Sequence, residues 1–525
     1  MNDAVTVSTT TAVSNGVVQS NSTGTGAGLT VHYEAATASY TLNMGNGDET
    51  FTSDELSASS PAGTAVYNKP NGSESDSLTL HTVSTSTLTP YPYGGMGVWQ
   101  QTSTSGGDQT TTYTPFTYGM QTPTSGLPRT GAAEYSVDLI GYVTQPGSTL
   151  KSLAGQGLFA ADFLSSLFKA QVFPNETDMT TGSSVGTGVG LVAYGHLYST
   201  TTAFSGTTNF QDGNGYYTGP FDGRFYGPAA QNVGVSFSGY NSSGGSVVGS
   251  LFGANNGAAE PYTNLTLANI ITEQLFATQA VQMFTIANDA GGTTMIAENG
   301  NLTLSPDGSV VYASTPPVTF TSANLVASSR PNFTTYQETV NGEPTELDVY
   351  KAGASNTELA LSYMDLAVWR QGAGTAQQPD QYVIYNVFGI ATAPAILARL
   401  TGSAQYTGVA YGDAMDGSSR YNVTGASTYS VNFSSQNYTG SLTLNGANVA
   451  GGAGVSFGTF TFSSNIGTNG ESLQLSQGGT LVGQLSNQFY GPAADETGGS
   501  FLIQLKGGAL AGGIEIVGAT AAKRQ

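Results

Sequence analysis

The three histidines are the first residues to consider as ligands of a metal ion or haem, because the chain contains no cysteine. His196 shares a strand-like face with Tyr194 and Tyr198, an arrangement that could ligate haem or a metal. His32 and His81 stand alone, and no HExxH motif occurs. We therefore favour a surface histidine on a strand, and predict no metal site and no bound cofactor.

Other sequence patterns that could indicate ion binding or catalysis are equally weak. The segment from Asp212 to Gly215 resembles the start of a calcium loop, but no acidic ligand follows it, so it predicts a hairpin turn. Matches to GxSxG arise from the Gly/Ser-rich composition and lack a strand–elbow–helix context. No P-loop is present. These absences favour a protein that is not an enzyme.

The charge of the chain excludes a further class of function, nucleic-acid binding. The chain has a net charge of −21, with only 13 basic residues among 525. No Lys/Arg cluster could neutralise phosphates, so the sequence predicts no nucleic-acid binding. An acidic field suits a basic partner. The 28 Tyr and 23 Phe are too many for a chain that buries no surface, so we expect folded domains.

Aromatic side chains are better candidates for function, because aromatic residues on loops make good interface anchors. We interpret seven of them as ligand-binding: Tyr91, Tyr93, Tyr113, Phe116, Tyr118, Tyr216 and Tyr217. The alternative is that they pack one part of the fold against another, and for Tyr91, Tyr93 and Phe116 both interpretations stay open.

An internal repeat organises the elements that must position these residues. The only two tryptophans, Trp99 and Trp369, lie in similar motifs 270 positions apart (369 − 99). A second motif, FYGPAA, begins at Phe225 and again at Phe489, 264 positions apart (489 − 225). The repeat predicts a tandem duplication with a boundary near residue 256, and it assigns Trp99 and Trp369 to the shared fold.

Within each half, alternation of apolar and polar residues predicts antiparallel strands. Residues 301–312 predict a hairpin around Ser-Pro-Asp-Gly. The spacing of apolar residues in 264–288 predicts a short helix, with Thr263 or Asn269 as its cap. The Ser/Thr-rich residues 1–25 predict a flexible tether.

The FYGP motifs carry a family resemblance. Followed by polar positions and a Gly-Gly-Ser-Phe sequence in the second copy, the motif is similar to the barrel hallmark of the transferrin-binding protein B family of bacterial surface lipoproteins. The resemblance implies structural roles for these positions: Phe225, Tyr226, Gly227, Pro228, Phe489, Tyr490, Gly491, Pro492, Gly498, Gly499 and Phe501. Gly491 and Pro492 would form a tight corner, and Gly498 and Gly499 would let a strand pack closely before Phe501 enters the core.

The first copy departs from this pattern. Gly234 and Val235 replace the double glycine, so we expect its strand to be spaced differently.

The resemblance implies a mainly β fold of two tandem lobes, each with a β-rich handle followed by a small antiparallel eight-stranded barrel. The expected domains are a tether (1–25), the first handle (26–126), the first barrel (127–255), the second handle (256–397) and the second barrel (398–525).

The resemblance also implies a non-enzymatic binding protein at the bacterial cell surface, which captures a nutrient or its carrier for a TonB-dependent outer-membrane transporter. We expect the ligand on the first lobe, over residues 85–125 and 205–222. The alternative is a structural or adhesive spacer. No apolar run is long enough for a membrane helix, so attachment is expected through a lipid anchor that this sequence lacks.

Overall fold

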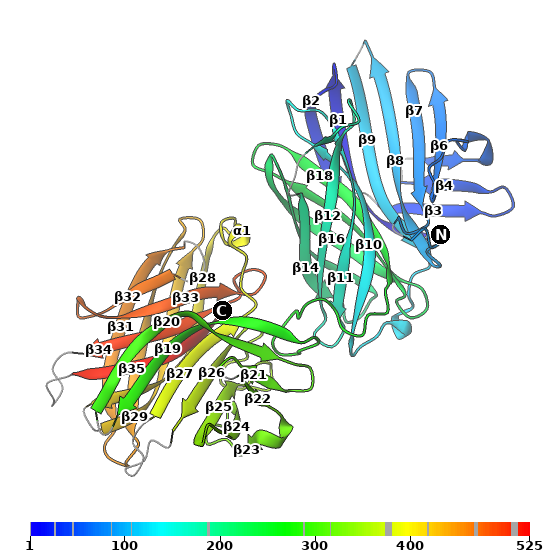
Figure 1. The fold of residues 1–525 in the computed structure, drawn as a ribbon. Coiled ribbons are helices and arrows are strands. Elements are labelled where there is room, and N and C mark those ends of the chain that lie inside the picture. The colour runs from blue at the N-terminus through cyan, green and yellow to red at the C-terminus, as the bar shows by residue number, and fades with distance from the viewer. Residues whose placement is uncertain are drawn as a thin grey trace. The chain divides into compact units, whose positions relative to one another are not determined.

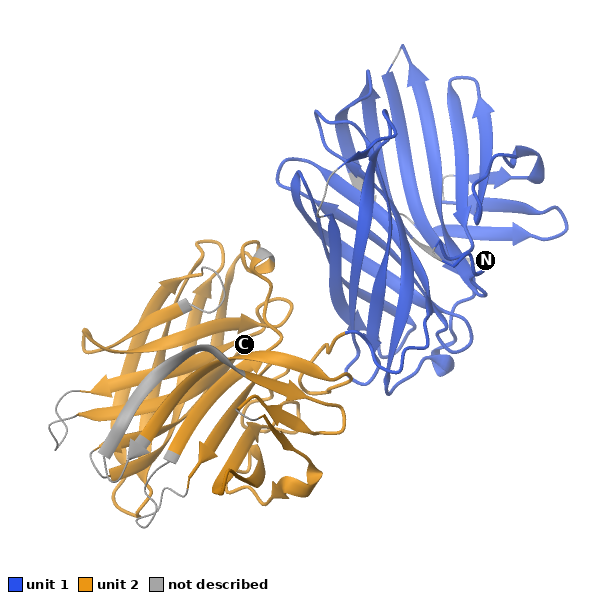
Figure 2. Cartoon of the chain, in the orientation of Figure 1, with its two compact units in different colours: residues 1–262 blue, residues 263–525 orange. Residues whose placement is uncertain are grey.

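In the computed structural model the chain forms two compact units, residues 1–262 and 263–525 (Figure 2). The structure describes every residue except 1, 26–27, 45–46, 86, 107, 186–188, 287–288, 315–316, 373–380, 417–418, 467–470 and 506–512. The units meet after Tyr262 and not at the expected 255/256. The reason is that Glu134 accepts hydrogen bonds from Asn256 Nδ2 (2.6 Å) and Tyr262 N (2.8 Å), which hold residues 256–262 to the first unit.

The first handle (residues 2–119) is a curled antiparallel sheet (Figure 1). Its sheet order is β5-β4-β3-β1-β9-β8-β7-β6, with β2 also paired to β1. Its strands are β1 (Asn2–Ser14), β2 (Val17–Thr25), β3 (Leu29–Glu34), β4 (Ser39–Asn43), β5 (Asp48–Phe51), β6 (Thr64–Asn71), β7 (Glu74–His81), β8 (Gly94–Ser105) and β9 (Asp108–Gly119), with a 3-10 turn η1 (Ser53–Glu55). Lys69 on β6 pairs with Glu49 on β5, so the two edges of the sheet approach each other.

The first barrel (residues 132–255) closes through eight antiparallel strands, because β11 pairs with both β10 and β12. It follows the 3-10 turn η2 (Thr124–Gly126). Its strands are β10 (Ala132–Thr144), β11 (Lys151–Asp162), β12 (Leu167–Asp178), β14 (Gly190–Leu197), β15 (Ala203–Asp212), β16 (Gly215–Tyr226), β17 (Asn232–Tyr240) and β18 (Ser246–Asn255), with the short β13 (Ser184–Val185) beside β12. Phe159, Phe168, Phe204 and Phe225 fill the interior.

The second handle (residues 274–389) repeats this plan, in the order β22-β21-β20-β19-β27-β26-β25-β24-β23. Its elements are β19 (Gln274–Ile286), β20 (Asp289–Leu304), β21 (Val310–Tyr312), β22 (Val318–Phe320), η3 (Ser322–Asn324), β23 (Leu325–Val326), β24 (Phe333–Val340), β25 (Glu343–Tyr350), β26 (Met364–Gln371) and β27 (Gln381–Gly389). The hairpin predicted at 301–312 is confirmed, with Gly308 N donating to Ser305 O. Trp99 and Trp369 are buried at the same place in β8 and β26.

The second barrel (residues 403–524) is closed by eight consecutive strands after a one-turn helix α1 (Pro394–Leu397). They are β28 (Ser403–Asp416), β29 (Ser419–Asn432), β30 (Asn437–Asn448), β31 (Val455–Asn465), β32 (Glu471–Gln477), β33 (Thr480–Tyr490), β34 (Glu496–Leu505) and β35 (Ile514–Arg524). The predicted fold class of two handle-plus-barrel lobes is therefore confirmed. The expected handle–barrel boundaries, 126/127 and 397/398, fall in the segments that join the sheets.

Two expectations are wrong. The tether is wrong because residues 2–25 form β1 and β2, and Val7, Thr9 and Thr11 on β1 are buried. The Ser/Thr-rich composition suits a strand, since β-branched residues pack well in sheets.

The helix at 264–288 is also wrong, although residues 287–288 lie outside the described part of the chain. The Asn264 side chain accepts hydrogen bonds from Ile271 N (2.7 Å) and Thr272 N (3.1 Å) and so closes an irregular loop. The residues that follow form β19, which pairs on both sides with β20 and β27. Sheet pairing thus overrides the local helical spacing.

The FYGP motifs form the expected tight corners. Gly227 and Gly491 both have a φ of 86°, in the left-handed region that suits glycine. A Cβ on Gly491 would lie 2.7 Å from Tyr363 Cδ2, and one on Gly227 would lie 2.6 Å from Tyr93 Cδ2. Each corner therefore holds a tyrosine from the segment that precedes β8 or β26.

We predict that Gly491→Ala destabilises the second lobe more than Gly478→Ala. Both glycines have positive φ, but a Cβ on Gly478 would meet nothing within 4 Å. The glycine strain is therefore common to both variants, at about 1 kcal/mol or more, and the excess for Gly491→Ala measures the contacts with Asp495 and Tyr363. Urea unfolding of the two variants gives this difference. Equal losses would show that the corner tolerates a methyl group.

The first barrel differs from the second at one cross-strand pair, where a changed strand was expected. In the second barrel Gly499 faces Asn487, and a Cβ on Gly499 would lie 1.5 Å from Ser486 O. In the first barrel Val235 takes the place of Gly499, and its partner is Gly223, where a Cβ would lie 2.3 Å from Phe204 Cζ. The glycine has moved to the facing strand, so each barrel keeps one residue without a side chain in this cross-strand pair.

Handle and barrel are joined by different chemistry in the two lobes. In the first lobe Tyr113 stacks on Tyr142 at 4.1 Å between ring centroids, and the surrounding cluster is apolar. In the second lobe Asp413 takes the place of Tyr142, and Arg370 Nη2, from the β26 position that corresponds to Gln100 on β8, donates to Asp413 Oδ2 at 3.2 Å. The first junction rests on aromatic burial and the second on a buried ion pair.

Candidate binding surface

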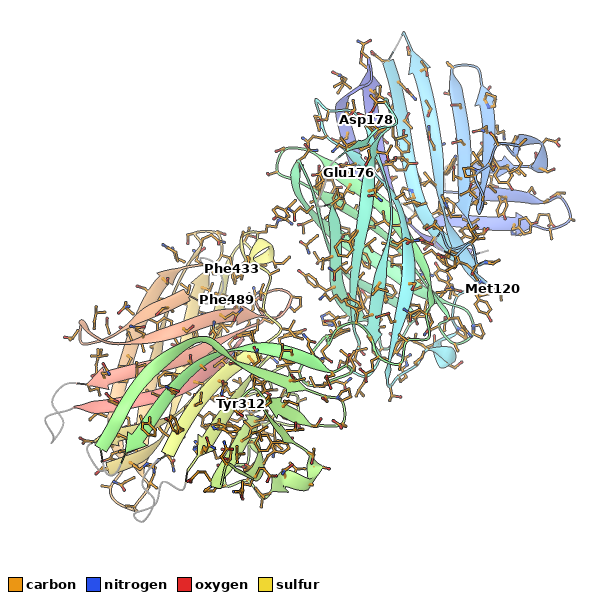
Figure 3. All side chains as sticks on the ribbon, viewed as in Figure 1. Met120, Glu176, Asp178, Tyr312, Phe433 and Phe489 are labelled. Atoms are coloured by element: carbon orange, nitrogen blue, oxygen red, sulfur yellow. The ribbon has the colours of Figure 1, made fainter. Side chains whose placement is uncertain are left out.

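The loops of the first lobe gather at one end of its barrel, which we call the distal end. Met179 N donates to Leu150 O, and Gln145 Nε2 donates to Ser243 O, so three barrel loops touch. The β1–β2 turn of the handle reaches the same place, since Val18 N donates to Ser148 O. Figure 3 shows Glu176 and Asp178 at this end of the unit and Met120 away from it.

The predicted ligand surface, residues 85–125 and 205–222, is only partly brought together there. The turn ending at Asp108 lies beside Ser14 at the end of β1, and the turn at residues 212–215 closes β15 onto β16. In contrast, Thr122 N donates to Phe225 O, and Gly126 lies against Pro228, at the FYGP end. The 85–125 segment therefore spans both ends of the lobe.

Most of the seven predicted ligand-binding aromatics are interior. Four are buried: Tyr91, Tyr113, Phe116 and Tyr217. Tyr93 and Tyr118 are half-buried, and Tyr118 packs against the handle core. The packing alternative describes Tyr91, whose hydroxyl donates to Asp138 Oδ2 at 2.5 Å and ties the handle to the barrel wall. Ligand contact by these buried and half-buried aromatics stays a prediction, and their burial argues against it.

Tyr216 is the predicted residue that is exposed at the distal end, with 43% of its surface accessible. Two more large side chains are exposed there, Tyr240 at 48% and Met179 at 43%. Neither residue was predicted from the sequence. The signal was available, because each stands where an alternating strand pattern ends and a polar turn begins.

The same strand positions in the second lobe carry Thr480, Gln504 and Val449, by the offsets of 264 and 270 (216 + 264, 240 + 264, 179 + 270). The shared scaffold thus presents two tyrosines and a methionine in one lobe and no aromatic side chain at these positions in the other. Aromatic and methionine side chains are enriched at protein interfaces.

A buried charged cluster supports this end from inside the first barrel. Lys151 Nζ lies 2.9 Å from Glu176 Oε2 and 3.6 Å from Asp212 Oδ2. Asp212 Oδ1 also accepts a hydrogen bond from Asn214 N (2.8 Å), which fixes the turn before Tyr216. Burial raises the pKa of Glu176, and the nearby Asp212 carboxylate adds to this while Lys151 opposes it.

The raised pKa of Glu176 predicts a pH dependence with a definite sign. The folded lobe binds the proton more tightly than the unfolded chain does, so the stabilisation is present at low pH and is lost as pH rises through the folded pKa. Over the pH range above the ordinary glutamate pKa of about 4.3, wild type should therefore lose stability relative to Glu176→Gln as pH rises. Thermal unfolding across this range measures the difference, and parallel curves would contradict the assignment.

Asp178→Asn is the control, because the contribution of Asp178 to stability should change with pH in the opposite direction. The Thr149 hydroxyl and the backbone N–H groups of Thr181 and Thr180 donate to the Asp178 carboxylate and lower its pKa. Its stabilisation is therefore present above the ordinary carboxyl pKa and is lost on acidification.

The histidines do not converge. His32 and His196 are exposed on separate sheets, and His81 is half-buried on β7. The predicted turn at residues 212–215 is confirmed as a hairpin. Within the described residues, no three His, Asp or Glu side chains are grouped to hold a metal ion. None of the helices in the described ranges has the length and hydrophobicity to span a bilayer.

Some solved structures are similar to this chain over most or all of its length. A mutant of the vaccine antigen transferrin binding protein B (TbpB) from Haemophilus parasuis Hp5 matches 100% of this chain and 96% of its own, at 14% identity and a TM-score of 0.30. Intact Ap-TbpB, with N and C lobes, matches the same shares at 13% identity and 0.30.

The chain is similar to TbpB. The isotype 1 TbpB of serogroup B Neisseria meningitidis matches 83% of this chain and 85% of its own, at 16% identity and a TM-score of 0.27. No family model and no curated protein matches the sequence. The likeness to TbpB concerns the fold, and the sheet pairing described above establishes the handle-plus-barrel lobes by itself.

Proposed function

We propose that this protein is a non-enzymatic, surface-exposed binding protein that captures a nutrient or its carrier for an outer-membrane transporter. The observation that carries the proposal is the difference between the two copies at the distal end. Tyr216, Tyr240 and Met179 are exposed in the first lobe, on a scaffold that otherwise repeats in the second.

The barrels themselves favour a ligand on the loops. Aromatic and aliphatic side chains fill both interiors, so neither barrel is a container for a ligand. The TbpB structures bear a transferrin-binding name, which makes a protein ligand a reasonable partner class. The net charge of −21 favours a basic partner and salt-sensitive association. Attachment to the outer membrane and delivery to a TonB-dependent transporter complete the proposal.

The test starts with the full-length protein immobilised in spent and fresh growth medium, with mass spectrometry and metal analysis of what it retains. Affinity for the retained component is then measured for wild type and for Tyr216→Ala/Tyr240→Ala. Each truncated anchor should cost about 1–3 kcal/mol, or about a thousandfold in affinity for the pair in the middle of that range. The matched control is Tyr33→Ala/Tyr198→Ala, since those tyrosines are 51% and 46% exposed and lie elsewhere on the first lobe.

Unchanged affinity in Tyr216→Ala/Tyr240→Ala would move the ligand away from the distal end. The second candidate function is a rigid surface spacer, favoured by the sheet-rich lobes with filled cores. A spacer retains no component of the medium, and its loss would alter surface adhesion without altering growth on limiting nutrients.

A further inference from the structure

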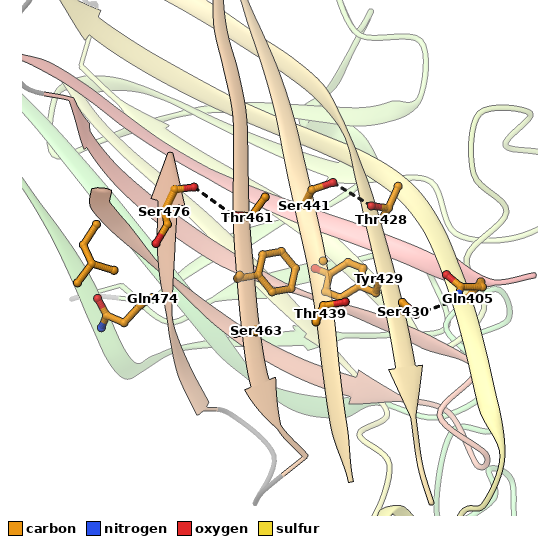
Figure 4. Close-up of a pocket in the computed structure, with 13 residues that line it drawn as sticks. Gln405, Thr428, Tyr429, Ser430, Thr439, Ser441, Thr461, Ser463, Gln474 and Ser476 are labelled. Atoms are coloured by element: carbon orange, nitrogen blue, oxygen red, sulfur yellow. Dashed lines mark hydrogen bonds between the residues drawn. The ribbon is translucent and has the colours of Figure 1, made fainter. Parts of the chain in front are cut away.

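A groove lies on the outer wall of the second barrel, across strands β28 to β33 (Figure 4). It encloses about 720 Å³. Hydroxyl and amide side chains line most of it, together with the bare backbone of Gly440, and no lining residue is charged. Cross-strand pairing places Gln405, Ser430, Thr439 and Ser463 in one row along its floor.

The corresponding row of the first barrel is covered by the chain itself. There the pairing aligns Glu134, Ala160, Lys169 and Tyr194. Residues 256–262 continue past this row: Asn256 N donates to Glu134 O (3.0 Å), Tyr262 N donates to the Glu134 carboxylate, and Lys169 Nζ lies 5.8 Å from the Tyr262 ring. The first lobe thus shows an irregular polypeptide segment seated on this wall.

The second lobe reproduces the start of this arrangement. Gln525 N donates to Gln405 O at 2.9 Å, as Asn256 N does to Glu134 O. Gln405 occupies the position of Glu134, and its Nε2 donates to Ser430 Oγ at 2.9 Å. Its Oε1 is an acceptor that can take a backbone N–H in the way the Glu134 carboxylate takes Tyr262 N.

The neighbouring seam of the barrel offers further main-chain groups. Strands β31 and β32 form a single cross-strand pair, Thr461 with Ser476, in the part of the chain that the structure describes. The corresponding strands of the first barrel, β14 and β15, form eight pairs, from Gly190–Gln211 to Leu197–Phe204. Thr461, Ser463, Gln474 and Ser476 from this seam line the groove. Loosely paired strands leave backbone donors and acceptors for an added segment.

We propose that this groove binds an irregular, uncharged polypeptide segment of a partner protein, seated as residues 256–262 are seated on the first barrel. The absence of charge from the lining selects against acidic and basic segments, because an unpaired charge would lose hydration without gaining a partner. Main-chain hydrogen bonds to the seam and to Gln405 supply the binding, and the hydroxyl row sets the polar character of the segment. This site lies on the second lobe and does not involve Tyr216 or Tyr240.

The experiment uses the full chain and a fluorescent, end-capped peptide with this chain's residues 255–263 and the change Glu260→Gln, which makes the probe uncharged. Fluorescence polarisation should show saturable binding. Thr439→Trp fills the groove floor from an exposed position and should weaken binding by about tenfold or more. Thr443→Trp is the matched control, since Thr443 is exposed on the same strand outside the groove and should leave affinity unchanged.

Thermal unfolding of both variants verifies that each keeps the fold. No saturable binding, or equal binding by Thr439→Trp and Thr443→Trp, overturns the proposal. A parallel titration with maltoheptaose tests a neutral glycan as occupant. Displacement of the peptide by this sugar would assign the groove to carbohydrate and also overturn the proposal.

Discussion

Replacing Arg370 by alanine should destabilise the second lobe by about 3–5 kcal/mol, because it removes one partner from a buried ion cluster. Arg370 Nη1 lies 2.9 Å from Asp348 Oδ2, and Nη2 lies 3.2 Å from Asp413 Oδ2. Tyr385 also donates its hydroxyl to Asp413, at 2.5 Å. Without the guanidinium, the two carboxylates lose their closest cation at the junction between handle and barrel, and Arg330 Nη1 remains 3.9 Å from Asp348 Oδ2.

Urea unfolding followed by Trp369 fluorescence measures this loss, since Trp369 is adjacent to Arg370 and the change Trp99→Phe removes the only other tryptophan. Lys351→Ala is the control, because Lys351 is exposed and its ammonium donates only to Pro331 O among the interactions of the described residues. We expect that variant to change stability by about 0.5 kcal/mol or less. A loss below 1 kcal/mol for Arg370→Ala would show that the carboxylates are solvated or protonated once the arginine is gone.

Phe501→Ala should cost about 3–5 kcal/mol, the range for a large aromatic side chain in a packed core. Phe501 is fully buried on β34 and faces Gly518 on β35, where an added Cβ would lie 2.4 Å from the ring. The first barrel repeats this contact with Phe237 over Gly249. Because the ring lies flat against a backbone without a side chain, its removal leaves a cavity that neighbours cannot readily fill.

Thermal and urea unfolding of Phe501→Ala test this value, with Leu481→Ala as the exposed control from the same barrel. Leu481 is 63% exposed, so its truncation should be nearly neutral. A small loss of stability in Phe501→Ala would show that the ring lies on the surface, whereas the strand alternation predicts an interior position. One apolar cluster includes both Met364 of the handle and Val517 of the barrel, so a single transition for the whole lobe is expected.

The repeat, the barrels and the FYGP corners could be predicted from the sequence because identical residues recur at matched spacing and short-range alternation marks half-buried strands. The residues at 2–25 and 264–288 could not be assigned that way. Threonine-rich β1 is a strand because β9 and the barrel bury one of its faces, and Asn264 closes a loop where apolar spacing alone favours a helix. Both depend on contacts distant in sequence.

The candidate site was predicted less well, for a related reason. Aromatic residues anchor interfaces and also fill cores, and only the pairing register tells which face of a strand each one occupies. Tyr216 and Tyr217 are adjacent, yet one is exposed and the other is fully buried. The groove on the second barrel has no sequence signature, because scattered serines, threonines and glutamines become a row only when four strands align.

The exchange of glycine between facing strands limits how the two lobes can recombine. Val235 is compatible with Gly223, and Gly499 with Asn487, but a valine from the first copy placed opposite Asn487 would put its Cβ into the backbone of Ser486. The two hairpins, β16–β17 and β33–β34, are therefore units of inheritance. Gene conversion or a designed chimera can move either hairpin whole between lobes, whereas a crossover that joins β33 to β17 sets Val235 opposite Asn487 and creates this clash.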